Sequence, residues 1–206
     1  MPYIFGPSTH PGSSVSKDFE PEIDGLLLAR LQSDDTLSHE ELETVPRVLR
    51  IGRLGRKREL PAFLGWNFGP LIVSARPREL LEELDPGRLE YIPMTVRSDR
   101  EFDGRTEHGT YFLIVPPPCL DAVVVEETAF RRGFGRAGFM ASAGWLSSEP
   151  GSPCVLDGQK IGGRHLWRLS DAFNTEYVCS DEFWRRVKQE NLKGWTAKKT
   201  CTVRPT

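Results

Sequence analysis

A strand–helix–strand pattern that occurs twice is the feature of this sequence that most constrains its fold. The first copy has a strand at residues 71–73, a helix capped by Ser74 and a strand at 89–96; the second has a strand at 177–179, a helix capped by Ser180 and a strand at 195–203. In each copy, hydrophobic residues occur at helical spacing between two short apolar or alternating runs. Such a unit buries its apolar surface only when its helix packs on a sheet. The pattern therefore predicts an α/β (α+β) fold.

The segment between the two copies is rich in short apolar runs. These runs, each typical of a strand, lie at residues 111–115, 122–126, 153–157 and 164–169. Asp157-Gly158 and Gly162-Gly163 are turn signals within this segment. We therefore expect a mixed β-sheet with packed helices, in which two strand–helix–strand units flank a β-rich middle. The sequence does not indicate the order of the strands.

The first 63 residues differ in composition from the rest of the chain. Residues 1–22 are dense in Pro, Gly and Ser, which favours an extended arm. Ser38-His39-Glu40-Glu41 matches a capping box, so a short helix is expected to begin at His39 and to end before Pro46. We predict an N-terminal acidic/basic arm with a short helix at residues 1–63, packed on a main α/β domain at residues 64–206.

Charge is distributed unevenly along this first part. Residues 1–45 carry two basic and nine acidic side chains, a net charge of −7, and residues 46–60 carry six basic and one acidic, a net charge of +5. Two interpretations stay open: the segments neutralise each other on the folded surface, or the acidic segment faces a basic partner. The run from Arg47 to Arg58 is also a candidate nucleic-acid patch. It has no interleaved aromatic residues, and the whole chain has a net charge of −2, which disfavours that reading.

No sequence motif for catalysis, cofactor binding or a metal site stands out. Residues 133–138 spell G-x-G-x-x-G, but no strand leads into these glycines and no good helix follows, so we predict a Gly-rich loop without a nucleotide. The cysteines are far apart in sequence, and we expect all of them to be reduced thiols without a metal. They are Cys119, Cys154, Cys179 and Cys201. We predict no cofactor.

His165 alternates with Trp167 and Leu169 along an expected strand, a position where a histidine is more often packed or hydrogen-bonded than catalytic. An alternative function nevertheless stays open: an enzyme or small-ligand-binding protein with a pocket between the two strand–helix–strand units, near His165 or Arg168. No apolar run approaches the roughly 18 residues that span a membrane, and residues 1–7 do not resemble a signal peptide. We therefore expect a cytoplasmic protein with no membrane partner.

Several segments, taken in order, resemble a family of bacterial immunity proteins from polymorphic-toxin systems. They are Leu71–Ser74, Leu80–Leu84, Leu89–Pro93, Tyr111–Val115, Cys119–Ala122, Val155–Asp157 with Lys160-Ile161, His165–Leu169, Val178–Ser180 and Leu192–Trp195. The resemblance covers roughly residues 64–203. It implies an antitoxin that neutralises a cognate toxin in bacterial competition, by direct protein–protein binding and occlusion without catalysis. It brings no catalytic residues with it.

Two segments are the candidate contact sites for such a partner. One is the acidic segment 18–43, because many toxins that act on nucleic acid or nucleotides have basic clefts; the other is the aromatic loop 131–146, because buried aromatics often dominate binding energy. The candidate partner-binding residues are Asp34, Asp35, Glu40, Glu41, Glu43, Phe134, Phe139 and Trp145. The expected partner is thus a toxin domain, with no nucleic acid and no membrane, and the sequence leaves monomer and homodimer both open.

Overall fold

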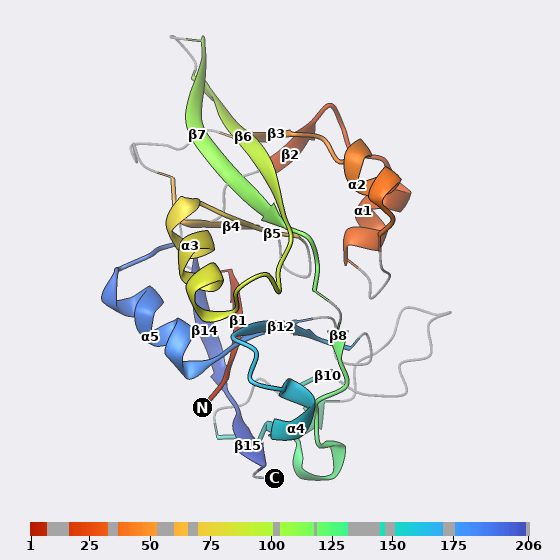
Figure 1. Ribbon diagram of the computed structural model, residues 1–206, viewed down its shortest axis with the longest axis vertical. Helices are drawn as coiled ribbons and strands as arrows, with labels where there is room; N and C mark the ends of the chain where they lie inside the picture. The colour runs from red at the N-terminus through yellow and green to blue at the C-terminus, as the bar shows by residue number, and fades with distance from the viewer. Residues whose placement is uncertain are drawn as a thin grey trace.

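The computed structural model shows an α+β fold built around two mixed sheets (Figure 1). The described residues are 1–7, 17–32, 37–52, 60–65, 70–100, 104–117, 119–131, 145–146, 151–170 and 176–204. In Figure 1 a six-stranded sheet occupies the upper half, with the long β6–β7 hairpin rising above it, and a five-stranded sheet lies below. Helices α3 and α5 lie side by side on one flank, and α1 and α2 lie on the other.

The six-stranded sheet has the order β2-β3-β6-β7-β5-β4. Its strands are β2 (Lys17–Glu20), β3 (Val48–Ile51), β4 (Phe63–Gly65), β5 (Leu71–Val73), β6 (Tyr91–Arg100) and β7 (Gly104–Ile114). Neighbours are antiparallel except β3 and β6, which are parallel. Helices α1 (Gly25–Gln32) and α2 (His39–Thr44) join β2 to β3. They pack apolar side chains, including Leu27, Leu31 and Leu42, into one cluster with this sheet.

The five-stranded sheet has the order β14-β1-β13-β12-β8. Its strands are β1 (Tyr3–Pro7), β8 (Cys119–Leu120), β12 (Leu166–Leu169), β13 (Tyr177–Cys179) and β14 (Trp195–Thr200). Strand β1 is antiparallel to both of its neighbours, β13 and β14. Two smaller pairs complete the strands: β9 (Phe130–Arg131) with β10 (Trp145–Leu146), and β11 (Val155–Asp157) with β15 (Thr202–Arg204).

The two strand–helix–strand units predicted from the sequence are confirmed. They are β5-α3-β6, with α3 at Ala75–Leu84, and β13-α5-β14, with α5 at Asp181–Gln189. The Ser180 side chain accepts a hydrogen bond from the backbone N–H of Phe183 (3.1 Å), whereas Ser74 occupies the N-cap position without a side-chain cap bond. Phe183 packs edge-on against Phe5 and Phe63, so one aromatic cluster joins α5 to both sheets.

The β-rich middle is also confirmed, with two local differences. Of residues 122–126, only Val123 pairs, in a single bridge to Leu156, and Val125–Glu127 form the short 3-10 helix η1. Asp157 does not enter a tight turn. Its side chain accepts hydrogen bonds from the backbone N–H groups of Gln159 (2.9 Å) and Lys160 (3.3 Å), and so caps the start of helix α4 (Gly158–Ile161). The N-cap carboxylate supplies hydrogen-bond acceptors for the first N–H groups of a helical turn, so a helical turn is favoured here over a tight turn.

The described parts of residues 1–22, which are residues 1–7 and 17–22, are more integrated into the fold than an extended arm. Strand β1 lies inside the five-stranded sheet with Ile4 and Phe5 buried, and β2 forms an edge of the other sheet. Strands β1 and β3 of the first 63 residues thus pair with strands of the later part, β1 in the five-stranded sheet and β3 in the six-stranded sheet. The division of the chain into residues 1–63 and 64–206 stays a prediction.

Candidate protein-binding surface on helices α1 and α2

Three of the candidate contact residues lie on helix α2. The Glu40 and Glu43 side chains are exposed, and Glu41 is half-buried. Asp34, Asp35, Phe134 and Phe139 lie outside the described residues, and for Trp145 only the backbone is described, paired with Arg131 between β10 and β9. The structure therefore brings together the glutamates of the acidic segment, while the contribution of the aromatic loop stays a prediction.

Helix α2 begins where the capping box predicts, and this capping box assigns Glu41 a structural role. Ser38 Oγ accepts a hydrogen bond from the Glu41 N–H (3.2 Å), and Glu41 Oε2 accepts one from the Ser38 N–H (2.8 Å). The Arg30 guanidinium on α1 also contacts the Glu41 carboxylate. The backbone hydrogen bond from Ser38, aided by the Ser38 hydroxyl and by Arg30, holds the pKa of Glu41 below its ordinary value. Glu41 thus joins the two helices and is not a free surface charge.

Glu40 and Glu43 are left facing solvent on the same short helix. His39 Nε2 lies 3.4 Å from Glu43 Oε1, and both side chains are largely exposed. Leu42 points the other way and packs in the core. Contacts between such exposed charges contribute little to folding stability, so Glu40 and Glu43 can be changed with small structural cost.

Helix α1 adds an exposed leucine that the sequence reasoning missed. Leu27 and Leu31 are four residues apart and face the core, whereas Leu26 is 73% exposed. The Asp24 carboxylate caps this helix by accepting hydrogen bonds from the N–H groups of Leu26 (2.9 Å) and Leu27 (3.1 Å). A signal was present, because successive residues of a helix point about 100° apart and the run Leu26-Leu27-Leu28 cannot face one core.

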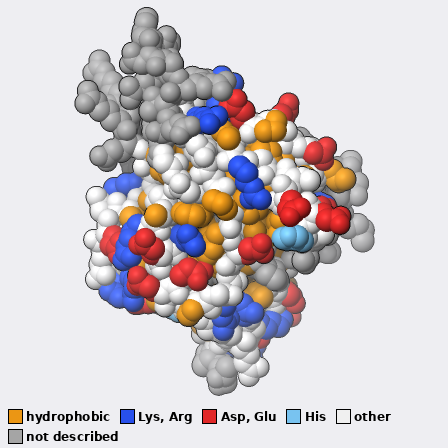
Figure 2. All heavy atoms as spheres, turned by 45° about the horizontal axis from the view of Figure 1, so that its top comes forward, with side chains coloured by type: hydrophobic (Ala, Val, Ile, Leu, Met, Phe, Trp, Pro, Cys, Tyr) orange, Lys and Arg blue, Asp and Glu red, His pale blue; other side chains and the backbone are white. Residues whose placement is uncertain are grey.

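We use the name α1–α2 surface for Leu26 together with the exposed acidic side chains on these two helices and in the residues just before α1. It comprises Glu22, Asp24, Leu26, Glu40 and Glu43. Figure 2 shows a face on which acidic side chains gather beside a histidine at the edge of an apolar area. An exposed apolar side chain among carboxylates suits a protein partner that has an apolar depression within a basic surface.

The two residues proposed for an alternative pocket hold elements of the fold together. His165 Nδ1 of the ring lies 2.7 Å from Ser180 Oγ, and the backbone N–H of His165 donates a hydrogen bond to Asp85 Oδ2 at 2.5 Å. Arg168 is 2% exposed, and its Nη2 donates to the last carbonyl of helix α1, that of Gln32, at 2.7 Å. These contacts give both residues a structural role, as expected for His165 from its place on a strand.

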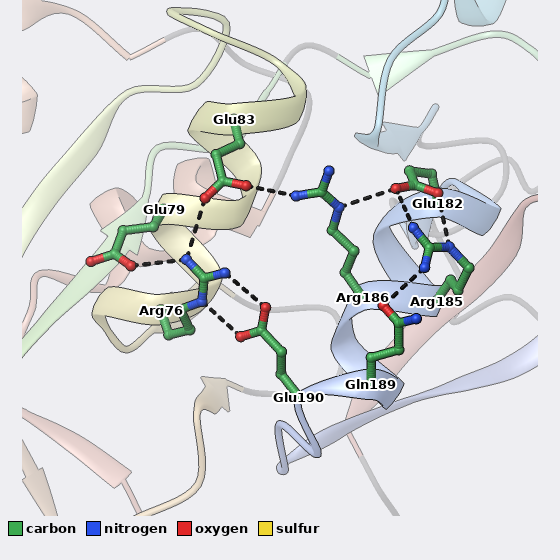
Figure 3. Close-up of polar contacts among 8 residues, drawn as sticks. All are labelled: Arg76, Glu79, Glu83, Glu182, Arg185, Arg186, Gln189 and Glu190. Carbon is green, nitrogen blue, oxygen red and sulfur yellow. Dashed lines mark hydrogen bonds and ion pairs between the residues drawn. The ribbon is translucent and has the colours of Figure 1, made fainter.

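Ion pairs connect helix α3 of the first strand–helix–strand unit to helix α5 of the second and to Glu190, which follows α5 directly. Figure 3 shows Arg76 of α3 donating from Nε and Nη2 to Glu190 (2.7 Å each), and Arg186 of α5 donating to Glu83 (2.6 Å). Hydrogen bonds from Arg185 and Arg186 lower the pKa of Glu182 to about 2. Helices α3 and α5 are thus held together between the two strand–helix–strand units, which is where the alternative of an enzyme or small-ligand-binding protein places its pocket.

The basic run is described only in part. The Arg47 side chain is exposed and its Nη2 donates to the Leu42 carbonyl at the end of α2 (3.3 Å), while residues 53–59 lie outside the described ones. Within the described ranges, no group of three His, Cys, Asp or Glu side chains could hold a metal ion. No helix among them is long and apolar enough to span a membrane.

A comparison with protein-family models assigns most of the chain to one family. A family model described as "Immunity protein family (Imm11)" matches residues 25–201. No curated protein matches the chain. The matched range confirms the resemblance seen in the sequence and begins at the first residue of α1, so it includes both helices of the α1–α2 surface.

Proposed function

The chain belongs to the Imm11 immunity protein family, and we propose that it neutralises a toxin protein by binding it directly and occluding it, without catalysing a reaction. The α1–α2 surface is the part of the proposal that this structure supports. A stable complex of this kind buries roughly 1,600 Å² in total, with an apolar centre and a polar rim. Leu26 would lie at that centre, and Glu40 and Glu43 would lie on the rim.

The single observation that carries this placement is an exposed leucine, Leu26, on a helix pair whose Glu40 and Glu43 carboxylates are exposed. Burying Leu26 against a partner removes apolar surface from water, which favours association. The carboxylates steer a basic partner toward the surface, which mainly raises the association rate. A toxin that handles phosphate-bearing substrates needs cationic groups, and a carboxylate surface can cover them.

A charge-reversal experiment tests the placement. The double variant Glu40→Lys/Glu43→Lys is compared with Glu126→Lys/Glu127→Lys in η1, where two exposed glutamates receive the same change. Association with the toxin domain encoded beside this chain's gene is measured by stopped flow at low and high salt. We expect the first variant to associate roughly 10-fold more slowly at low salt, with a smaller difference at high salt, and the second within about twofold of the unmodified chain.

Two outcomes separate the function from its location. If the unmodified chain neither binds that toxin domain nor protects cells that produce it, the proposed function is wrong. If the unmodified chain binds and both double variants associate equally fast, binding occurs elsewhere and the α1–α2 surface is excluded.

A further inference from the structure

Cys154 and Cys201 lie against each other although 47 positions separate them in sequence. The parallel pairing of β11 with β15 puts Val155 beside Thr202, and the Thr202 N–H donates to the Cys154 carbonyl at 2.9 Å. This register brings the preceding residues together. The two Sγ atoms are 2.8 Å apart in a hydrogen bond, and the residues are 2% and 0% exposed.

The surroundings favour one thiolate in this pair. The hydrogen bond from the Cys201 thiol lowers the pKa of Cys154, and the Lys199 ammonium acts in the same direction. Lys199 is held nearby by its hydrogen bond to Ser152 Oγ (2.8 Å). Glu176 and burial oppose the shift. The same hydrogen bond keeps Cys201 protonated by raising its pKa. Cys154 is therefore the sulfur that ionises first.

Access to the pair depends on strand β15. All three residues of β15 are exposed, and β15 is held to β11 by a ladder only three residue pairs long. Short exposed strands of this kind open locally at a small part of the global unfolding cost. Cys201 directly precedes β15 and Cys154 directly precedes β11, so local opening of this strand pair is the route by which a small reagent would reach the two thiols. Cys179, in contrast, lies on β13 between β1 and β12, and burial raises its pKa.

We propose that Cys154 and Cys201 are a modification site that reacts with low-molecular-weight disulfides such as oxidised glutathione and closes into an intramolecular disulfide. The Cys154 thiolate attacks one glutathione sulfur, forms a mixed disulfide and releases one glutathione thiolate. Cys201 loses its proton to solvent and attacks the Cys154 sulfur, which forms the Cys154–Cys201 bond and releases the second glutathione thiolate. The two cysteines are oxidised by two electrons in total, and one oxidised glutathione is reduced to two thiols.

The bond would link the two ends of a segment that contains β12, β13, α5 and β14. Closing a segment of this length restricts the unfolded chain, and the entropy model gives a stabilisation that raises Tm by about 5–15 °C. The proposal is independent of the proposed function, since it concerns the scaffold and not the α1–α2 surface.

The test treats the purified, fully reduced chain with oxidised glutathione and counts thiols after denaturation. We expect the four thiols to fall to two, the intact mass to fall by about 2 Da, and a tryptic map to join the Cys154 and Cys201 peptides. Cys154→Ser should prevent the thiol loss, while Cys119→Ser, which changes a half-buried cysteine on β8, should leave the bond and the Tm rise intact.

Three results would overturn the proposal: four remaining thiols, a stable glutathione adduct on Cys154, or a map that joins any other pair. The peptide map of the unmodified chain decides the matter without a variant, so a Cys154→Ser chain that fails to fold does not weaken the test. Toxin binding plays no part in any of these readouts, which keeps this proposal separable from the proposed function.

Discussion

Leu26 and Leu31 lie on the same helix, and shortening each to alanine should change a different property: binding for Leu26 and folding stability for Leu31. Leu26 is 73% exposed and Leu31 is 1% exposed. If the α1–α2 surface binds the toxin, Leu26→Ala removes an interface contact and leaves the fold intact. Leu31→Ala removes a core contact and leaves the interface intact. The pair therefore separates binding from stability within one helix.

The size of the Leu26 effect follows from its exposure. Leucine exceeds alanine by three carbon groups, and each contributes about 0.8 kcal/mol when buried, or about 2.4 kcal/mol together. Only the exposed 73% can become newly buried in a complex, which leaves about 1.8 kcal/mol. That free energy corresponds to roughly a 20-fold increase in Kd. The stability cost of Leu26→Ala should stay within about 0.5 kcal/mol.

Leu31→Ala has the reverse profile. Its side chain packs against the cluster beneath α1, so truncation leaves a cavity and should lower the free energy of unfolding by about 2.7–5 kcal/mol. The remaining folded molecules should bind the toxin domain with a Kd within about twofold of the unmodified chain.

Isothermal titration calorimetry against the toxin domain and urea unfolding of the free chain measure the two quantities. Titration without denaturant at about 10–20 °C, where the free energy of unfolding is typically largest, keeps the greatest fraction of Leu31→Ala folded. A Kd for Leu26→Ala within about twofold of the unmodified chain, with the complex otherwise formed, would refute the reasoning. It would mean that Leu26 stays in water when the toxin is bound.

Two further predictions concern the scaffold. The pKa of Glu182 is lowered to about 2, so its ion pairs stabilise the fold at pH values above the ordinary pKa of a glutamate and are lost as the pH falls toward 2. The drop in Tm between about pH 7 and about pH 3 should therefore be smaller in Glu182→Gln than in the unmodified chain. The same drop in both chains would show that these ion pairs contribute nothing to stability. Gly194→Ala should lower the free energy of unfolding by more than about 3 kcal/mol, because its φ is +115° and a Cβ would lie 2.0 Å from the Phe63 carbonyl oxygen. Gly87→Ala is the matched control, with φ +66° and nothing within 4 Å of the new Cβ, and should cost only about 1–2 kcal/mol in the same urea titration.

The parts of the fold that the sequence predicted are those with a local cause. Helix caps are one example: in the capping box of Ser38 and Glu41 and in the cap of Ser180, each side chain bonds a backbone N–H only three residues away. The residues that make these bonds are therefore close together in the printed sequence. The apolar runs of β5 and β13 are buried on both faces, which makes them continuous and easy to recognise.

The missed parts depend on distant partners. Tyr3-Ile4-Phe5 is a short apolar run among Pro and Gly, and it becomes a strand because β13 and β14 supply its hydrogen bonds from more than 170 residues away. Cys154 and Cys201 meet for the same reason, through the pairing of β11 with β15. Sequence spacing carries no signal for either contact.

The sequence predicted the acidic residues of the candidate site but not its exposed leucine. Glu40 and Glu43 were found as acidic residues and are exposed, but Glu41 was grouped with them although its capping box already gave it a structural partner. Leu26 was missed because the candidates were chosen among acidic and aromatic residues, and only the rotation of the helix shows which leucine of the three faces water.

The place of β1 also determines when the molecule can fold. Strand β1 lies at residues 3–7, yet both strands that flank it, β13 and β14, lie at residues 177–200. A growing chain on the ribosome therefore cannot complete the five-stranded sheet until β13 and β14 have emerged, and contacts so far apart in sequence form slowly. A chain that ends before residue 177 would leave β1 without either of its neighbours in the five-stranded sheet.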